Sequence, residues 1–228
     1  ILAVVSILYG AIMAIGQTDM MRLISYTSIS HFGFIVLGIF SMTSVAWSGS
    51  TLYMVNHGFS TAGLFLFAAM LVHRRGSKRI ADYGGWQRVT PGLAGIFLLA
   101  GLATLSLPGL GSFISEFLVV LGSFPRHQIL TAIATTGVIL AALYVLLMYK
   151  RMMTGPKPTS ADTARIKDLT VREKWVAAPI IVAFLALGFF PKLALDIINP
   201  SVDKTLTSYV KVADPVPDHA VTGEGSPR

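Results

Sequence analysis

Long apolar runs separated by short charged stretches are the dominant pattern of this chain. A helix needs about 20 apolar residues to cross a hydrocarbon core roughly 30 Å thick. Six runs meet or approach that length, and they cover Ile1–Gln17, Leu23–Val45, Thr51–Val72, Gly92–Ser123, Ile129–Met153 and Trp175–Phe190. The pattern therefore predicts an all-α membrane protein, an antiparallel bundle of about six transmembrane helices.

The fourth run is too long for one straight, upright span, because about 32 residues rising roughly 1.5 Å each would extend about 48 Å. Its middle contains Pro108, Gly109 and Gly111. Proline removes an amide donor, and glycines loosen the backbone. The run therefore predicts one discontinuous helix, broken near Pro108, whose irregular backbone faces protein or water and not lipid.

The last apolar run closes at Phe190-Pro191, and the sequence beyond it is rich in Pro, Asp, Gly and Ser. We expect residues 1–191 to form the transmembrane bundle and residues 192–228 to form a mostly irregular C-terminal segment. The chain starts within an apolar run, without a cleavage-site pattern. We therefore expect it to be the C-terminal portion of a longer protein.

Lys and Arg are distributed unevenly over the alternate loops. The loops on one side of the predicted bundle carry 13 of them, and those on the other side, including the C-terminal segment, carry five. Cytoplasmic loops retain positive charge. The first side is therefore predicted to be cytoplasmic, and the C-terminus is predicted to be non-cytoplasmic.

The composition supports a membrane protein. Hydrophobic residues make up 54% of the chain and charged residues 13%, whereas soluble domains have about 25% charged residues. The formal charge of +7 is compatible with nucleic-acid binding, but the basic residues lie beside apolar runs and not among stacking aromatics. The lipid bilayer is therefore an expected partner, and nucleic acid is not. Without cysteine, the chain has no thiolate ligand for a metal or an iron–sulfur cluster.

Glu116 is the only acidic residue inside any predicted span. A carboxylate that faced lipid would be costly, so Glu116 should face the bundle interior, just after the predicted break. This placement favours a role in proton transfer. The alternative is a packing carboxylate satisfied by neighbouring hydroxyls or by free backbone groups at the break.

His31 and His57 lie inside the second and third predicted spans. An imidazole can accept or release a proton near neutral pH, so both are candidate proton-pathway residues together with Glu116. The alternative for each is interhelical hydrogen bonding, which histidine commonly provides in membranes. No pair of ligands has the i, i+4 spacing of a helical metal site, so no metal site is predicted.

Three stretches carry a family resemblance: Gln17–Phe34, Asn56–Gly58 and Leu107–Phe117. Together they resemble the antiporter-like membrane subunits of proton-pumping NADH:quinone oxidoreductase, respiratory complex I, and the resemblance extends to about Pro191. L-type and N-type subunits and the related Mrp antiporters usually have Lys where this chain has Glu116. By that difference the chain resembles the C-terminal portion of the M-type subunits.

The resemblance implies a proton-translocating, non-redox subunit of an NADH:quinone oxidoreductase translocase, without a complete active site of its own. Glu116 would be the terminal proton-pathway residue, and His31 and His57 match the family's membrane histidines. NADH, FMN, iron–sulfur clusters and quinone are expected in other subunits, with no cofactor in this chain. L-type and N-type subunits are the expected neighbours.

The resemblance also bears on location and on the rival function. A bacterial cell (inner) membrane is expected, with the mitochondrial inner membrane as the alternative. The alternative function is that of an Mrp-type cation/proton antiporter subunit, which would act without NADH chemistry.

Overall fold

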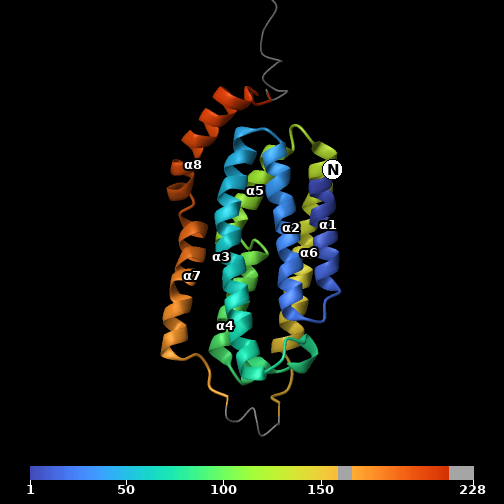
Figure 1. Ribbon diagram of the computed structural model, residues 1–228, viewed down its shortest axis with the longest axis vertical. Coiled ribbons are helices and arrows are strands. Elements are labelled where there is room, and N and C mark those ends of the chain that lie inside the picture. The colour runs from blue at the N-terminus through green and yellow to red at the C-terminus, as the bar shows by residue number, and fades with distance from the viewer. Residues whose placement is uncertain (159–165, 216–228) are drawn as a thin grey trace, which may run out of the picture.

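Helices that run along one long axis make up most of the described chain, residues 1–158 and 166–215, in this computed structural model (Figure 1). Short helical turns cover Ile80–Asp82, Trp86–Arg88 and Thr205–Val210, and no strand occurs among the described residues. The predicted all-helical fold is confirmed. The α-helices are α1 (Leu2–Ile15), α2 (Met20–Phe40), α3 (Ser44–Arg75), α4 (Pro91–Thr104), α5 (Gly111–Ser123), α6 (Gln128–Met153), α7 (Val171–Phe189) and α8 (Lys192–Lys204).

Local sequence signals explain where the long helices begin and end. Asp19 precedes α2, and its carboxylate accepts hydrogen bonds from the amides two and three residues later, at 2.8 and 3.1 Å. Thr43 precedes α3 and accepts one from the amide of Ala46 at 3.2 Å. Each side chain satisfies a helix-end donor that has no partner within its helix. Gly76 ends α3 in the left-handed conformation that glycine adopts without strain.

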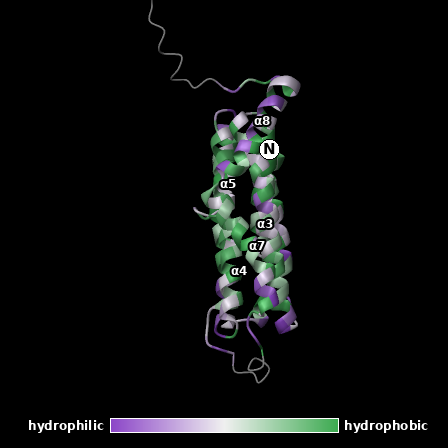
Figure 2. Ribbon diagram, turned by 90° about the vertical axis from the view of Figure 1, so that its left-hand side faces the viewer, coloured by the Kyte–Doolittle hydropathy of each residue, from purple (hydrophilic) through white to green (hydrophobic). Residues whose placement is uncertain are grey.

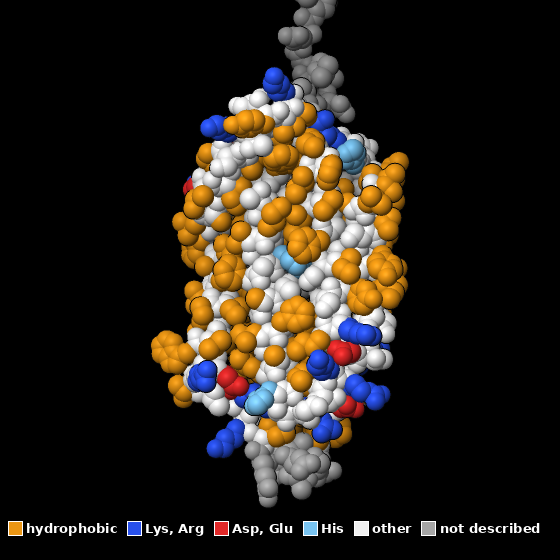
Figure 3. Space-filling view, viewed as in Figure 1, with side chains coloured by type: hydrophobic (Ala, Val, Ile, Leu, Met, Phe, Trp, Pro, Cys, Tyr) orange, Lys and Arg blue, Asp and Glu red, His pale blue; other side chains and the backbone are white. Residues whose placement is uncertain are grey.

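Apolar residues form a belt between two ends that carry most of the charge (Figures 2 and 3). By length and composition, α2, α3 and α6 can each cross a membrane, and α7 with residues 192–210 forms a fourth candidate that is bent by 70°. Helices α1, α4 and α5 are apolar but shorter. The chain is thus an integral membrane protein with three to four spans by these criteria, within the part of the chain that the structure describes.

A non-helical connection separates α4 from α5. Helix α4 ends at Thr104 and α5 begins at Gly111, with Pro108 between them. Ser106 and Gly109 both have left-handed backbone conformations, with φ of 61° and 90°. The two helices follow one another along the long axis in both ribbon views (Figures 1 and 2).

The segment after α7 is more helical than the sequence analysis predicted. Residues 192–228 were expected to be mostly irregular, but α8 and the turns that follow it extend to residue 210. Val202 and Leu206 are buried on one face, and Lys192 pairs with Asp196 one turn later at 2.7 Å. This amphipathic spacing favours a helix, although the polar composition and Pro200 obscured it. Residues 216–228 lie outside the described part.

Small residues allow two pairs of helices to approach closely. A Cβ atom added to Gly10 of α1 would lie 2.6 Å from the amide nitrogen of Ser30 on α2. A Cβ atom added to Gly122 of α5 would overlap the backbone of Ala46 on α3. These contacts are typical of membrane helix pairs, where glycine and serine allow backbone-to-backbone packing.

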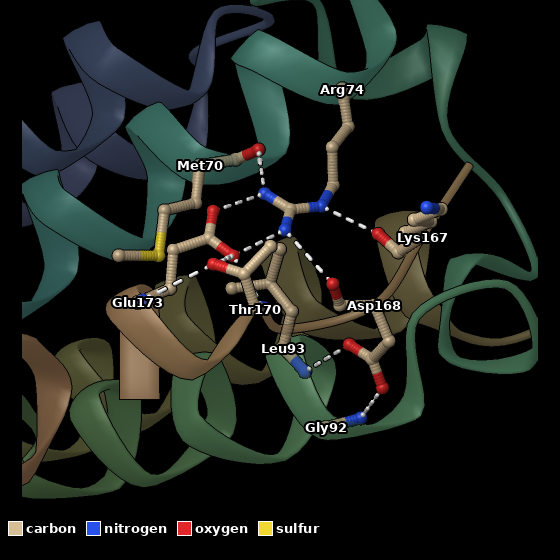
Figure 4. Close-up of polar contacts among 8 residues, drawn as sticks. All are labelled: Met70, Arg74, Gly92, Leu93, Lys167, Asp168, Thr170 and Glu173. Carbon is tan, nitrogen blue, oxygen red and sulfur yellow. Dashed lines mark hydrogen bonds and ion pairs between the residues drawn. The ribbon is translucent and has the colours of Figure 1, made fainter. Parts of the chain in front are cut away.

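A clamp of polar contacts joins α3, α4 and α7 at the end of the bundle where α3 stops (Figure 4). The guanidinium of Arg74 donates to both carboxylate oxygens of Glu173, at 2.8 and 2.7 Å, and to two carbonyls of the segment before α7. In that segment, the Asp168 carboxylate accepts hydrogen bonds from two amides at the start of α4, at 2.6 and 3.0 Å. The bidentate ion pair between Arg74 and Glu173 and the Asp168 cap at the start of α4 fix the positions of the three helix ends relative to one another.

Candidate functional site

Glu116 lies on the buried face of α5, one to two turns after the helix begins. Only 5% of the residue is exposed. Its Oε2 atom accepts a hydrogen bond from the Tyr53 hydroxyl at 3.5 Å, and its Oε1 atom is buried without a hydrogen-bond partner among the described residues. A buried carboxyl with an unpaired oxygen can take up a proton there or bind a water molecule.

His31 lies between two tyrosine hydroxyls. Its Nδ1 atom is 2.6 Å from the Tyr53 hydroxyl of α3, and its Nε2 atom is 3.1 Å from the Tyr144 hydroxyl of α6. All three side chains are almost fully buried, with 1% of each residue exposed. Tyr53 therefore connects His31 to Glu116, and four polar side chains from α2, α3, α5 and α6 form one hydrogen-bonded chain.

His57 lies beside this chain without a hydrogen bond to it. Its ring centroid is 5.5 Å from that of His31, and its ring nitrogens lie 3.3 Å from the hydroxyl of Thr61. The ring also packs edge-on against Phe32. The structure thus brings the three sequence-predicted residues into one region, but it links only His31 and Glu116 by direct hydrogen bonds through a third side chain.

The residues at the start of α5 are tied to α3 by Asn56. Its side-chain amide donates to the carbonyl of Gly111 at 2.6 Å and to the hydroxyl of Ser115 at 3.1 Å. A Cβ atom at Gly111 would lie 2.9 Å from the Asn56 side-chain oxygen, so glycine permits this approach. Gly109 supplies the left-handed turn, and Pro108 has no amide to leave unpaired. These contacts position the turn of α5 that carries Glu116.

A pocket of about 160 Å³ lies beside Glu116, between α5 and α6. Glu116 and Ser106 line it, and each has a buried oxygen without a hydrogen-bond partner among the described residues. Thr135 adds a third polar side chain, and the remaining lining residues are apolar. A pocket with several polar partners can hold water molecules that carry a proton to or from the carboxyl.

Tyr53 and Tyr144 were missed by the sequence reasoning. Tyr53 lies four residues before His57, a spacing that places both on one face of a helix, and this was the one available signal. Tyr144 has no such local signal, because it meets His31 across 113 residues of sequence. Among the described residues, no three His, Cys, Asp or Glu side chains lie close enough together to hold a metal ion.

The chain is similar in sequence to a family of membrane proteins and to named subunits of NADH-quinone oxidoreductases. Residues 1–143 match the family described as NADH:quinone oxidoreductase/Mrp antiporter, TM. The chain is 56% identical over its whole length to NADH-quinone oxidoreductase subunit M of Mycobacterium tuberculosis, and it covers 41% of that relative. It is 37% identical over 92% of its length to subunit M of Rhodobacter capsulatus, again covering 41% of the relative. The chain therefore spans less than half the length of these relatives.

Solved structures agree with the sequence comparison. A chain of respiratory complex I from Thermus thermophilus with bound NADH superposes with a TM-score of 0.83 at 34% identity, over 90% of this chain and 43% of that one. A chain of the Mrp complex from Dietzia sp. has the same fold, with a TM-score of 0.80 at 20% identity over 91% of this chain and 47% of that one. Taken together with the match over residues 1–143, these likenesses show that the chain belongs to the NADH:quinone oxidoreductase/Mrp antiporter transmembrane family.

Proposed function

We propose that this chain is the C-terminal portion of the M subunit of a proton-pumping NADH:quinone oxidoreductase, in which it transfers protons and no electrons. The observation that carries the proposal is the position of Glu116, which is buried, hydrogen-bonded to Tyr53 and provided with an unpaired oxygen beside a pocket. Ionisable groups inside a membrane commonly mark proton pathways. His31 joins the same hydrogen-bonded chain, and His57 lies next to it.

The M-type assignment is supported by the side chain at position 116. The family resemblance leads us to expect Lys there in L-type, N-type and Mrp subunits, whereas this chain has Glu116. The relatives that match over the whole chain or nearly so are named subunit M. A carboxyl group carries a proton as a neutral acid and a lysine carries it as a cation, so the two classes differ in the charge of the loaded site.

We further propose six spans, with α4 and α5 together forming one discontinuous span broken near Pro108. Helix α4 has 14 residues and α5 has 13. Each is thus about 20 Å long, whereas the hydrocarbon core is about 30 Å thick. Since the two follow one another along the long axis (Figure 2), they can cross the membrane jointly. The six spans would lie within residues 1–191, and residues 192–228 would form the C-terminal segment.

The distribution of charge supports an orientation. The end of the bundle with the α3–α4 and α6–α7 connections carries most Lys and Arg residues of the sequence. By the positive-inside rule this end would be cytoplasmic, and α8 would lie on the non-cytoplasmic side of a bacterial inner membrane. The proposed partners are the L-type and N-type membrane subunits. NADH, FMN, iron–sulfur clusters and quinone would be bound by other subunits.

Replacing Glu116 by Gln in the full-length subunit tests this function. The amide has a nearly identical shape but cannot take up and release a proton near neutral pH. In membranes that contain the assembled complex, we expect Glu116→Gln to reduce NADH-driven proton pumping by about tenfold or more, because a positioned acid or base commonly contributes about 10²–10⁴-fold. Asp196→Asn, an exposed acid on α8, is the matched control and should pump normally. Normal pumping by Glu116→Gln would overturn the proposal.

Co-purification separates this function from its rival. A complex that contains flavin and iron–sulfur subunits and oxidises NADH supports the M-subunit assignment. A complex that lacks these subunits and exchanges sodium ions for protons would instead show an Mrp-type antiporter.

A further inference from the structure

One hydroxyl group lies between the two titratable groups of the candidate site. The Tyr53 oxygen is 2.6 Å from His31 Nδ1 and 3.5 Å from Glu116 Oε2. A hydroxyl has a single proton to donate and accepts through its lone pairs. Tyr53 can therefore donate to only one of these neighbours at a time, and the other neighbour has to donate to it if both hydrogen bonds exist.

From this geometry we infer that Tyr53 is a proton-relay residue between His31 and Glu116, and that the direction of its O–H bond couples the protonation of Glu116 to the tautomer of His31. The inference rests on the proposed function. It adds Tyr53 to the proposed proton pathway, with the direction of the Tyr53 O–H bond as the part that switches. It follows from the fixed number of protons on each of the four groups, together with one proton that enters the chain at Tyr144.

The ionised form of Glu116 determines one arrangement. A carboxylate accepts only, so Tyr53 donates to Glu116, and the Nδ1–H of His31 donates to the Tyr53 oxygen. In the neutral imidazole the other nitrogen is then an acceptor, and it receives the hydrogen bond of Tyr144. Every donor in the chain therefore points toward Glu116.

Protonation of Glu116 through Tyr53 reverses the chain. One proton, released by a protonated water molecule from outside the four residues, binds the Tyr144 oxygen while the Tyr144 proton moves to His31 Nε2, the Nδ1 proton moves to Tyr53, and the Tyr53 proton moves to Glu116. The two tyrosines and the neutral imidazole each lose one proton and gain one, so the net change is one proton added to Glu116. A second proton cannot follow until Glu116 releases the first one, both hydroxyls rotate and the imidazole returns to its first tautomer.

The packing around Tyr53 suits this role. The ring packs against α2, where its centroid lies 6.5 Å from that of Phe34 and 5.9 Å from that of His31. The hydroxyl can thus change its donor direction by rotating its O–H bond without moving the ring. His57 stays outside the relay, because its hydrogen-bond partner is Thr61.

Tyr53→Phe in the full-length subunit of the assembled complex tests the inference. The ring and its packing remain, and only the relaying hydroxyl is lost. We expect NADH-driven proton pumping to fall by about tenfold or more, because positioned proton donors contribute about 10²–10⁴-fold. Tyr9→Phe, which removes the hydroxyl of an exposed tyrosine on α1, should leave pumping unchanged. Pumping at the wild-type rate by Tyr53→Phe would overturn the inference.

Infrared difference spectroscopy on the wild-type complex gives a readout that loss of packing would not produce. With ¹⁵N-labelled histidine, the His31 ring bands, identified by their loss in His31→Gln, should shift between the two tautomers as the Glu116 carboxyl band appears. The shift should be absent in Glu116→Gln. Tautomer bands that do not change when Glu116 is protonated would overturn the inference, and this measurement decides the matter if Tyr53→Phe fails to assemble.

The two proposals fail in different ways. If Glu116→Gln pumps normally, the proposed function is wrong. If Glu116→Gln loses pumping while Tyr53→Phe retains it, the function stands and the relay through Tyr53 is wrong.

Discussion

Asn56 shows how a single side chain fixes the position of Glu116. It donates to the Gly111 carbonyl at the first residue of α5 and to Ser115, the residue just before Glu116. Gly111 is the first residue of α5, where a carbonyl accepts from the amide four residues later, so the Asn56 amide adds a second hydrogen bond to the same buried carbonyl. The amide of Asn56 therefore both stabilises the helix start and places the carboxyl of Glu116 within reach of Tyr53.

Asn56→Asp should destabilise the subunit by about 1–3 kcal/mol, because it replaces a donor by an acceptor, removes the side-chain hydrogen bond to the Gly111 carbonyl and places a carboxyl oxygen against that carbonyl. We expect a lower midpoint of thermal unfolding for the detergent-solubilised complex, together with reduced pumping. Asn199→Asp makes the same chemical change at an exposed position of α8. Equal unfolding midpoints for the two variants would contradict this role of Asn56.

At the scale of helices, α3 contributes more residues to the site than any other helix. It carries Tyr53, Asn56 and His57, and it packs closely along α5. Gly49 of α3 and Gly122 of α5 both lie where a Cβ atom would overlap the facing helix. Since helices in lipid associate through van der Waals contact and not through the hydrophobic effect, this close approach is a main source of their association.

Gly122→Ala should therefore separate α5 from α3 and destabilise the complex by about 1–3 kcal/mol, the usual cost of overpacking. The control is Gly58→Ala on α3, where an added Cβ atom meets nothing within 4 Å and where alanine favours the helix by about 0.5–1 kcal/mol. Thermal unfolding in detergent should show a lower midpoint for the first variant and no decrease for the second. The opposite order would argue against close packing of α3 on α5.

At the scale of the whole molecule, the two ends of the bundle differ in chemistry. One end holds the Arg74–Glu173 clamp and the basic connections, and the other end holds α8 (Figures 1 and 4). The clamp joins segments that are 99 residues apart in sequence. A chain with such a charge difference crosses the membrane in one orientation, because basic loops remain on the cytoplasmic side.

Single cysteines introduced into the full-length subunit test this orientation, and the absence of native cysteine from this chain leaves no background from it. A membrane-impermeant maleimide added to intact cells should label Lys204→Cys on α8 and not Lys78→Cys in the α3–α4 connection. Inverted vesicles should show the opposite preference. Labelling of Lys78→Cys in intact cells would reverse the proposed orientation.

The sequence by itself determined the helical architecture, and it predicted a helix break near Pro108 and a role for Glu116 in proton transfer. These are local properties: apolar length sets a membrane helix, proline lacks a donor, and a lone carboxyl in an apolar run is costly wherever the helix packs. The helix beyond Pro191 was missed for a local reason as well, since its amphipathic spacing is interrupted by Pro200 and many polar residues.

Only the tertiary structure decided which groups meet Glu116. Tyr53 reaches it across 63 residues of sequence, and Tyr144 reaches His31 across 113. A tyrosine in an apolar helix has no pattern that distinguishes a packing ring from a hydrogen-bonded one, because its ring suits the core in either case. The relay depends on which faces of α2, α3, α5 and α6 turn toward one another, and this is set by the close packing of the helices.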